Sequence, residues 1–237
     1  MGAGVGLLLA GPPGAVGGAV AGPLVASVLR DLAHRFLSHR EDARVGGAVL
    51  VGVARLQERL DAGDQVRNDG LLASIPGRRS DGEEIIEGVL LVAQRDHEER
   101  KVEFLGYLLA NVCFESEVDS YLANWTIKTA QELTWAQLVM LSAVGRSDRP
   151  ILPNVEISTG VSEARSWGIH EQWADLGWAR REMILPRSRT TPRSGPIRSF
   201  ADYELMTGGT LLFQLMCLER IPLANVTEIS ALLQVSA

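Results

Sequence analysis

The stretch from Ser80 to Glu115 constrains the fold most, because its pattern predicts one long amphipathic helix around which the rest of the chain packs. Ser80 followed by Glu83 has the spacing of a capping box, in which each side chain bonds the other residue's backbone N–H. Acidic residues are concentrated in the first turns, where the helix dipole favours negative charge. Apolar residues then recur at helical spacing, at Ile86, Leu90, Ala93, Phe104, Leu105, Leu108 and Val112.

The middle of the expected helix interrupts this apolar pattern. Arg95–Lys101 is a run of seven polar residues, and at about 1.5 Å per residue it covers about two turns. We expect this run to be a solvent-exposed middle section of the helix, with ion pairs between neighbouring turns. His97 falls on the apolar side of the helix, so we expect it to be a hydrogen-bonded core residue. No second histidine or cysteine stands near it at metal-ligand spacing.

The composition favours a mainly α fold. Hydrophobic residues make up 46% of the 237 residues but aromatic residues only 5%, so small aliphatic side chains form most of the core. That balance suits closely packed helices better than a β-sandwich, since residues that favour strands are scarce. The two cysteines, Cys113 and Cys217, lie in apolar helical contexts and are expected to be buried, free thiols in a reducing compartment. The net charge of −6 does not indicate a nucleic-acid binder.

Residues 1–29 form a segment without charged side chains that is rich in Gly, Ala, Val and Leu. A membrane span needs about 20 apolar residues, so its length would suffice, although three prolines interrupt it. Gly14, Gly18 and Gly22 recur every four residues as a glycine zipper, which on a helix would let a second backbone approach closely. The alternatives are an association or membrane face and a soluble arm packed on the body.

Residues 30–117 are expected to form a helical domain. An amphipathic helix over Pro23–Leu37 leads into it, and a second helix over Asp42–Asp61 should pair with the first in antiparallel fashion. Turn residues then predict a loop from Ala62 to Arg79, before the long helix. If residues 1–29 enter a membrane, the arginines that follow would keep this domain cytoplasmic.

Residues 118–237 are expected to form a second domain that combines helices with a short β-hairpin. Thr134 and Gln137 have the spacing of a second capping box. The predicted helices cover Val118–Glu132, Trp135–Val144, Ser162–Asp175, Leu211–Leu218 and a final stretch that begins at Pro222. Two short strands, Met183–Leu185 and Phe200–Leu205, flank a basic, proline-containing loop over Pro186–Pro196.

Three stretches of the C-terminal half stand out as a set: Leu133–Leu138, Glu171–Trp178 and Tyr203–Gly209. They resemble, in that order, the start of the first helix, the end of the recognition helix and the segment that leaves the wing in winged helix-turn-helix domains. The resemblance covers about residues 118–220. The resemblance implies a wing that carries Arg187, Arg189, Arg193 and Arg198, which could contact phosphates. Acidic residues on the presumed recognition helix, Glu163, Glu171 and Asp175, would repel DNA, so the alternative is a winged-helix fold used for protein packing.

Enzyme signatures are missing from the sequence. It contains no P-loop, no dinucleotide fingerprint placed after a strand, and no G-x-S-x-G nucleophile elbow. The four histidines are scattered, and His34 and His39 are not spaced to share a helix face. We therefore expect no catalytic residues, no metal and no cofactor.

These patterns lead to two hypotheses about function. The first is a non-enzymatic, cytoplasmic protein that acts by self-association or membrane contact through its Gly-rich N-terminus, with a C-terminal sensing or partner-binding module. Such a division would suit a bacterial stress or phage-defence effector. The alternative is a DNA-binding transcriptional regulator whose N-terminal helices dimerise. The expected partners are thus further copies of the chain and a membrane surface, ahead of nucleic acid.

Overall fold

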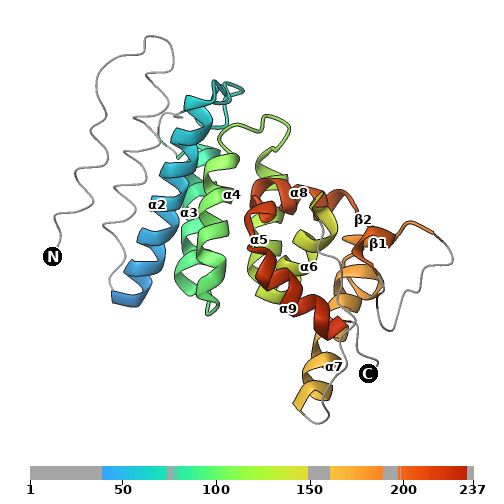
Figure 1. The fold of residues 1–237 in the computed structure, drawn as a ribbon. Coiled ribbons are helices and arrows are strands. Elements are labelled where there is room, and N and C mark those ends of the chain that lie inside the picture. The colour runs from blue at the N-terminus through green and yellow to red at the C-terminus, as the bar shows by residue number, and fades with distance from the viewer. Residues whose placement is uncertain are drawn as a thin grey trace. The chain divides into compact units, whose positions relative to one another are not determined.

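A computed structural model describes residues 39–73, 77, 79–148, 161–188, 197 and 199–233 of the chain. The chain divides into two compact units, 1–127 and 128–237, and the boundary between them falls inside a helix. The fold is mainly helical, with a two-stranded antiparallel sheet in the C-terminal unit, which confirms the predicted fold class (Figure 1). The expected segment over residues 1–29 and the helix over Pro23–Leu37 lie outside the described residues.

Within the described residues, the N-terminal unit contains a bundle of three helices that all contact one another: α2 (His39–Asp61), α3 (Asp81–Arg95) and α4 (Val102–Asn111). A short 3₁₀ turn, η1 (Glu99–Lys101), leads into α4. Helix α4 is the centre of the bundle, because nine of its ten residues are buried and Glu103 alone is exposed. Its apolar residues on every side explain this position, since a helix without a polar face must be covered all round.

The prediction of one long helix from Ser80 to Glu115 is wrong, because the chain turns between Arg95 and Val102. Helix α3 ends where Asp96 takes an extended conformation (φ −66°, ψ 130°), and the Asp96 side chain accepts a hydrogen bond from the Glu98 N–H at 2.9 Å. A local bond of this kind competes with helical backbone bonding. Helices α3 and α4 therefore form a hairpin, and they lie side by side in Figure 1.

The polar run at this turn also differs from the expected solvent-exposed section of helix. Lys101 and Asp96 are both buried, and the Lys101 ammonium lies 2.5 Å from the Asp96 carboxylate. Pairing makes the burial of both charges tolerable, since an isolated buried charge would be far more costly. His97 is not a core residue either, because its side chain is 92% exposed beside the turn. Once the helix ends at Arg95, the helical spacing that placed His97 on the apolar face no longer applies.

Helices α2 and α4 approach each other closely at two glycines. A Cβ on Gly106 would lie 2.6 Å from the Ala48 carbonyl oxygen and 2.7 Å from Val51 Cβ. A Cβ on Gly52 would lie 3.2 Å from the Gly106 carbonyl oxygen. The crossing thus depends on Gly106 above all, whereas a Cβ on Gly46 would meet nothing within 4 Å.

The C-terminal unit is built around α6 (Trp135–Gly145), in which all residues from Gln137 to Val144 are buried. Helix α5 (Ser120–Glu132) precedes it and spans the boundary between the units. The elements that contact α6 include α7 (Val161–Ala174), β2 (Tyr203–Leu205), α8 (Thr207–Leu215) and α9 (Leu223–Leu233). Three short turns complete the unit: η2 (Asp175–Ala179), which is a π-helical turn, and the 3₁₀ turns η3 (Phe200–Asp202) and η4 (Leu218–Arg220).

The small sheet is fixed to α7 by aromatic packing. Strand β1 (Ile184–Pro186) pairs with β2 in antiparallel register, with Ile184 opposite Leu205. Trp173 of α7 packs edge-on against Tyr203 and Phe200, with ring centroids 5.0 and 5.9 Å away. Phe200 belongs to η3 and not to the predicted strand, because the Ser199 hydroxyl accepts a hydrogen bond from the Ala201 N–H and turns the chain.

Two groups of local predictions are confirmed. Both capping boxes form, at Ser80 with Glu83 before α3 and at Thr134 with Gln137 before α6. Cys113 and Cys217 are buried thiols.

Candidate functional site

The site residues predicted from the sequence fall largely outside the described part of the chain. Gly14, Gly18 and Gly22 do so, as do Arg189, Arg193 and Arg198. Arg187 follows β1, and its side chain is half exposed. Its Nε donates a hydrogen bond to the Tyr203 carbonyl at 3.0 Å, and its guanidinium lies 4.0 Å from the Glu204 carboxylate. The guanidinium of Arg187 therefore contacts strand β2 of the hairpin.

Three of the six large apolar side chains that are exposed in the described residues lie on α5. Tyr121 is 85% exposed, Trp125 41% and Leu122 37%. Residues three and four apart share a helix face, so these three side chains form one surface, which we call the α5 ridge. The opposite face of α5 is buried, at Ala123, Thr126, Ile127 and Ala130. The ridge is thus the apolar face of α5 that stays exposed while the opposite face is buried.

The α5 ridge has the composition of a binding surface. Contiguous exposed apolar patches mark interaction sites, and Trp and Tyr are enriched among the residues that dominate binding energy. Exposed polar side chains, Asn124 and Lys128, lie beside it, as in the rim of an interface. The Asp119 carboxylate accepts a hydrogen bond from the Leu122 N–H at 2.8 Å, which fixes the first turn and holds the ridge in place. This surface was not predicted from the sequence.

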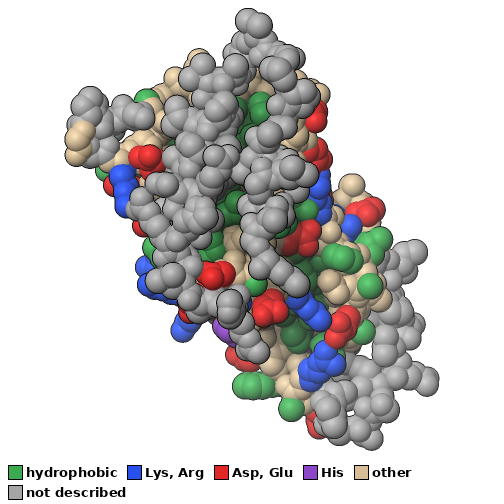
Figure 2. All heavy atoms as spheres, turned by 90° about the vertical axis from the view of Figure 1, so that its left-hand side faces the viewer, with side chains coloured by type: hydrophobic (Ala, Val, Ile, Leu, Met, Phe, Trp, Pro, Cys, Tyr) green, Lys and Arg blue, Asp and Glu red, His purple; other side chains and the backbone are tan. Residues whose placement is uncertain are grey.

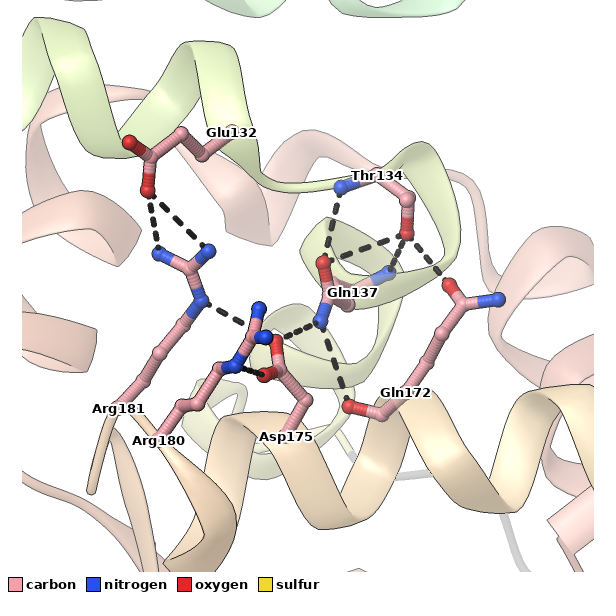
Figure 3. A network of polar contacts seen from close by, with 7 residues as sticks. All are labelled: Glu132, Thr134, Gln137, Gln172, Asp175, Arg180 and Arg181. Carbon is pink, nitrogen blue, oxygen red and sulfur yellow. Dashed lines mark hydrogen bonds and ion pairs between the residues drawn. The ribbon is translucent and has the colours of Figure 1, made fainter.

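A polar network joins the start of α6 to the end of α7 (Figure 3). The Thr134 hydroxyl accepts a hydrogen bond from the Gln137 N–H at 3.2 Å and lies 2.5 Å from Gln172 Oε1, to which it donates. The Gln137 side-chain amide donates to Asp175 at 2.9 Å. Because Gln137 also caps α6, one side chain sets both the start of α6 and its distance from α7.

Asp175 connects this network to two arginines. Arg181 Nε lies 3.2 Å from the Asp175 carboxylate, and both terminal nitrogens of Arg181 lie 3.3 Å from Glu132. Arg180 approaches the other Asp175 oxygen at 3.6 Å. The carboxylates and arginines thus neutralise one another around the π-helical turn. We assign the network a structural part, which is to fix α7 and the turn after it against α5 and α6.

The described residues contain no metal-binding cluster. Among them, no group of three or more His, Cys, Asp or Glu side chains is arranged to hold a metal ion. None of the helices in that part of the chain combines the length and the apolar character needed to cross a membrane. On the face drawn in Figure 2, described acidic and basic side chains are interspersed, and no large area of one charge gathers there.

Comparison with known proteins identifies no relative. No protein-family model, no curated protein and no solved structure matches the chain. The function must therefore be inferred from the exposed surfaces described above.

Proposed function

We propose that this protein acts by association and not by catalysis, and that the α5 ridge is one surface through which it self-associates. The observation that carries this proposal is the exposure of Tyr121 and Trp125 on one helix face. In this proposal the Gly-rich N-terminal segment supplies a further association or membrane contact through Gly14, Gly18 and Gly22. The winged-helix-like C-terminal half would then serve as a sensing or partner-binding module.

The energy available from the ridge is large enough for such a role. A buried Tyr or Trp side chain removes about 150–250 Å² from water, at about 25 cal/mol per Å². Even half of that area amounts to about 2 kcal/mol for each ring. Two such rings are typical of the few central residues that dominate a protein interface.

Sedimentation velocity of the full chain tests the ridge. Tyr121→Ser with Trp125→Ser should weaken self-association at least thirtyfold, since truncating a central aromatic residue costs about 2 kcal/mol or more. Leu223→Ser is the matched control, because Leu223 is a similarly exposed apolar residue on α9. Equal association of the wild type and the double variant would contradict the proposal.

The N-terminal segment needs a separate experiment. Gly18→Leu should weaken association if a second backbone lies against the glycine face, because the larger side chain would hold the helices apart. Deleting residues 1–22 should abolish any liposome binding. Sedimentation and liposome co-flotation of the wild type and both variants would measure these effects. Identical behaviour of all three would make the segment an inert arm.

DNA binding is the second candidate, and the half-exposed Arg187 beside the hairpin favours it. The exposed Glu163 and Glu171 on α7 weigh against it, because a recognition helix with these carboxylates would approach phosphates unfavourably. Replacing Arg187, Arg189, Arg193 and Arg198 with Ala should weaken DNA binding and reduce its salt dependence. A wild-type protein without salt-sensitive DNA binding would remove this candidate.

A further inference from the structure

Helix α7 has an exposed face opposite the face that it buries. Its inward face is buried at Ser166, Ile169 and Trp173, and the Ser166 hydroxyl donates a hydrogen bond to the Leu232 carbonyl of α9 at 2.8 Å. Helical spacing places a second set of residues on the opposite side. This set, which we call the α7 stripe, consists of Glu163, Ala164, Trp167, Gly168 and Glu171.

The α7 stripe presents an aromatic ring between two carboxylates. Trp167 is 60% exposed, and Glu163 and Glu171 stand four residues before and after it on the helix. Neither glutamate pairs with another residue in the part of the chain that the structure describes. A Cβ on Gly168 would meet nothing within 4 Å, so the backbone beside Trp167 is open to close approach. The Trp167 ring offers a large apolar face for packing, and the carboxylates on either side of it attract arginine.

The spacing of the stripe defines the ligand more closely. Glu163 and Glu171 are eight residues apart, which corresponds to about 12 Å along a helix. An extended peptide rises about 3.3 Å per residue, so two arginines four residues apart would span about 13 Å. The chain contains such a pair, since Arg189 and Arg193 are separated by Thr-Thr-Pro. In that alignment, the short segment between the arginines would cross the face of Trp167.

We propose that the α7 stripe binds the segment Arg189–Arg193 of a second copy of this chain. Each arginine would pair with one glutamate of the stripe, and Pro192 would pack against the Trp167 ring. Two copies could exchange the same contact around a two-fold axis, so the assembly closes as a dimer. This inference rests on the proposed self-association and assigns it a second surface, separate from the α5 ridge.

The first experiment measures binding of a fluorescently labelled peptide with the sequence of residues 186–198 to the full chain. Trp167→Ala, and Glu163→Gln together with Glu171→Gln, should each weaken binding at least tenfold. Glu219→Gln is the control, because Glu219 is an exposed glutamate outside the stripe. A peptide of the same composition with adjacent arginines should bind at least tenfold more weakly than the native peptide. Equal binding of the two peptides, or of all the variants, would overturn the proposal.

The second experiment distinguishes a partner's segment from the chain's own. One variant carries Glu163→Arg and Glu171→Arg, and the other carries Arg189→Glu and Arg193→Glu. Sedimentation should show that each associates more weakly than the wild type, and that an equimolar mixture regains association, because only the mixture brings an intact stripe to an intact segment. A mixture no stronger than its components would overturn binding in trans. If the wild type self-associates but does not bind the peptide, this inference alone fails. A wild type that stays monomeric refutes the proposed self-association as well.

Discussion

The two units use the same short motif, an arginine followed two residues later by an aspartate, but they use it to different extents. In the N-terminal unit the motif is Arg67-Asn68-Asp69, and in the C-terminal unit it is Arg146-Ser147-Asp148. Both arginines are buried, and each donates hydrogen bonds to its aspartate and to backbone carbonyls far along the chain. In both units a single guanidinium therefore supplies hydrogen bonds to several backbone carbonyls in place of water.

The number of carbonyls differs between the two arginines. Arg67 donates to four carbonyls just after α4, those of Val112, Glu115, Ser116 and Val118, at 2.7 to 3.3 Å. Arg146 donates to two carbonyls around the end of η4, those of Glu219 and Ile221, at 3.2 and 2.9 Å. No helix or strand covers the chain between α4 and α5, so we expect the N-terminal unit to depend more on its arginine.

The largest expected effect tests whether the units are separate. Leu108 of α4 and Leu141 of α6 are both fully buried at the centres of their units. An unpaired carboxylate in either core costs several kcal/mol, so Leu108→Asp should unfold the N-terminal unit and Leu141→Asp the C-terminal unit. Hydrogen exchange of the α2–α4 and α6–α9 amides would show which unit opens. Glu99→Ala, at an exposed position beside the turn, is the silent control.

The next effect concerns the arginines themselves. Arg67→Met should destabilise the N-terminal unit by about 3–5 kcal/mol, the cost of breaking a buried charged network. Arg146→Met should cost the C-terminal unit less, because fewer carbonyls lose their donor. Chemical denaturation followed by hydrogen exchange in each unit would measure both losses. If both variants lost the same stability, the number of carbonyls bonded by each arginine would not determine how strongly its unit depends on it.

A smaller effect is expected at the glycines of the N-terminal unit. Gly106→Ala should destabilise it by about 1–3 kcal/mol, because the added methyl group would overlap the Ala48 carbonyl and Val51. Gly46→Ala should stabilise it by up to about 1 kcal/mol, since alanine favours the helix and meets no neighbour there. Thermal unfolding of the two variants beside the wild type would check the opposite signs.

The smallest effect is the pH dependence of the two aspartates. Hydrogen bonds from Arg67 and Arg146 hold the pKa values of Asp69 and Asp148 below their ordinary value. A lowered carboxyl pKa contributes stability that is fully present above the unfolded pKa, about 3.9, and is lost as the pH falls through the folded value. Asp69→Asn and Asp148→Asn should therefore be less stable than the wild type at pH 7, and the difference should shrink below about pH 4. A difference that does not change with pH would contradict this linkage.

The starts of helices were easier to predict from the sequence than the turns and burial that depend on tertiary packing. Local chemistry determines a capping box, so Ser80 with Glu83 and Thr134 with Gln137 could be recognised without a structure. The turn at Asp96 could not, because a polar run is compatible with a solvated helix as well as with a turn. What decides between them is the burial of Lys101 beside Asp96, which depends on helices distant in sequence.

The candidate site was harder to predict than the fold. The arginines and glycines chosen from the sequence stand out by composition, but Arg187 is the one of them that the structure describes. The α5 ridge was missed because Tyr121 and Trp125 have the helical spacing of a core face, and spacing alone does not say which face of α5 the fold covers. The small buried residues on the other face, Ala123 and Ala130, are the signal that could have shown it.

The two cysteines allow the opening of each unit to be followed by its rate of thiol modification. The chain contains two cysteines, and Cys113 belongs to the N-terminal unit while Cys217 belongs to the C-terminal unit. Both are buried, and burial raises the pKa of Cys113 to about 11. Since the thiolate is the reactive form, alkylating reagents must wait until the surrounding structure opens. With a reagent that reacts faster than the structure recloses, the rate at which each thiol is modified under native conditions thus gives the opening frequency of the structure around it, without any engineered label.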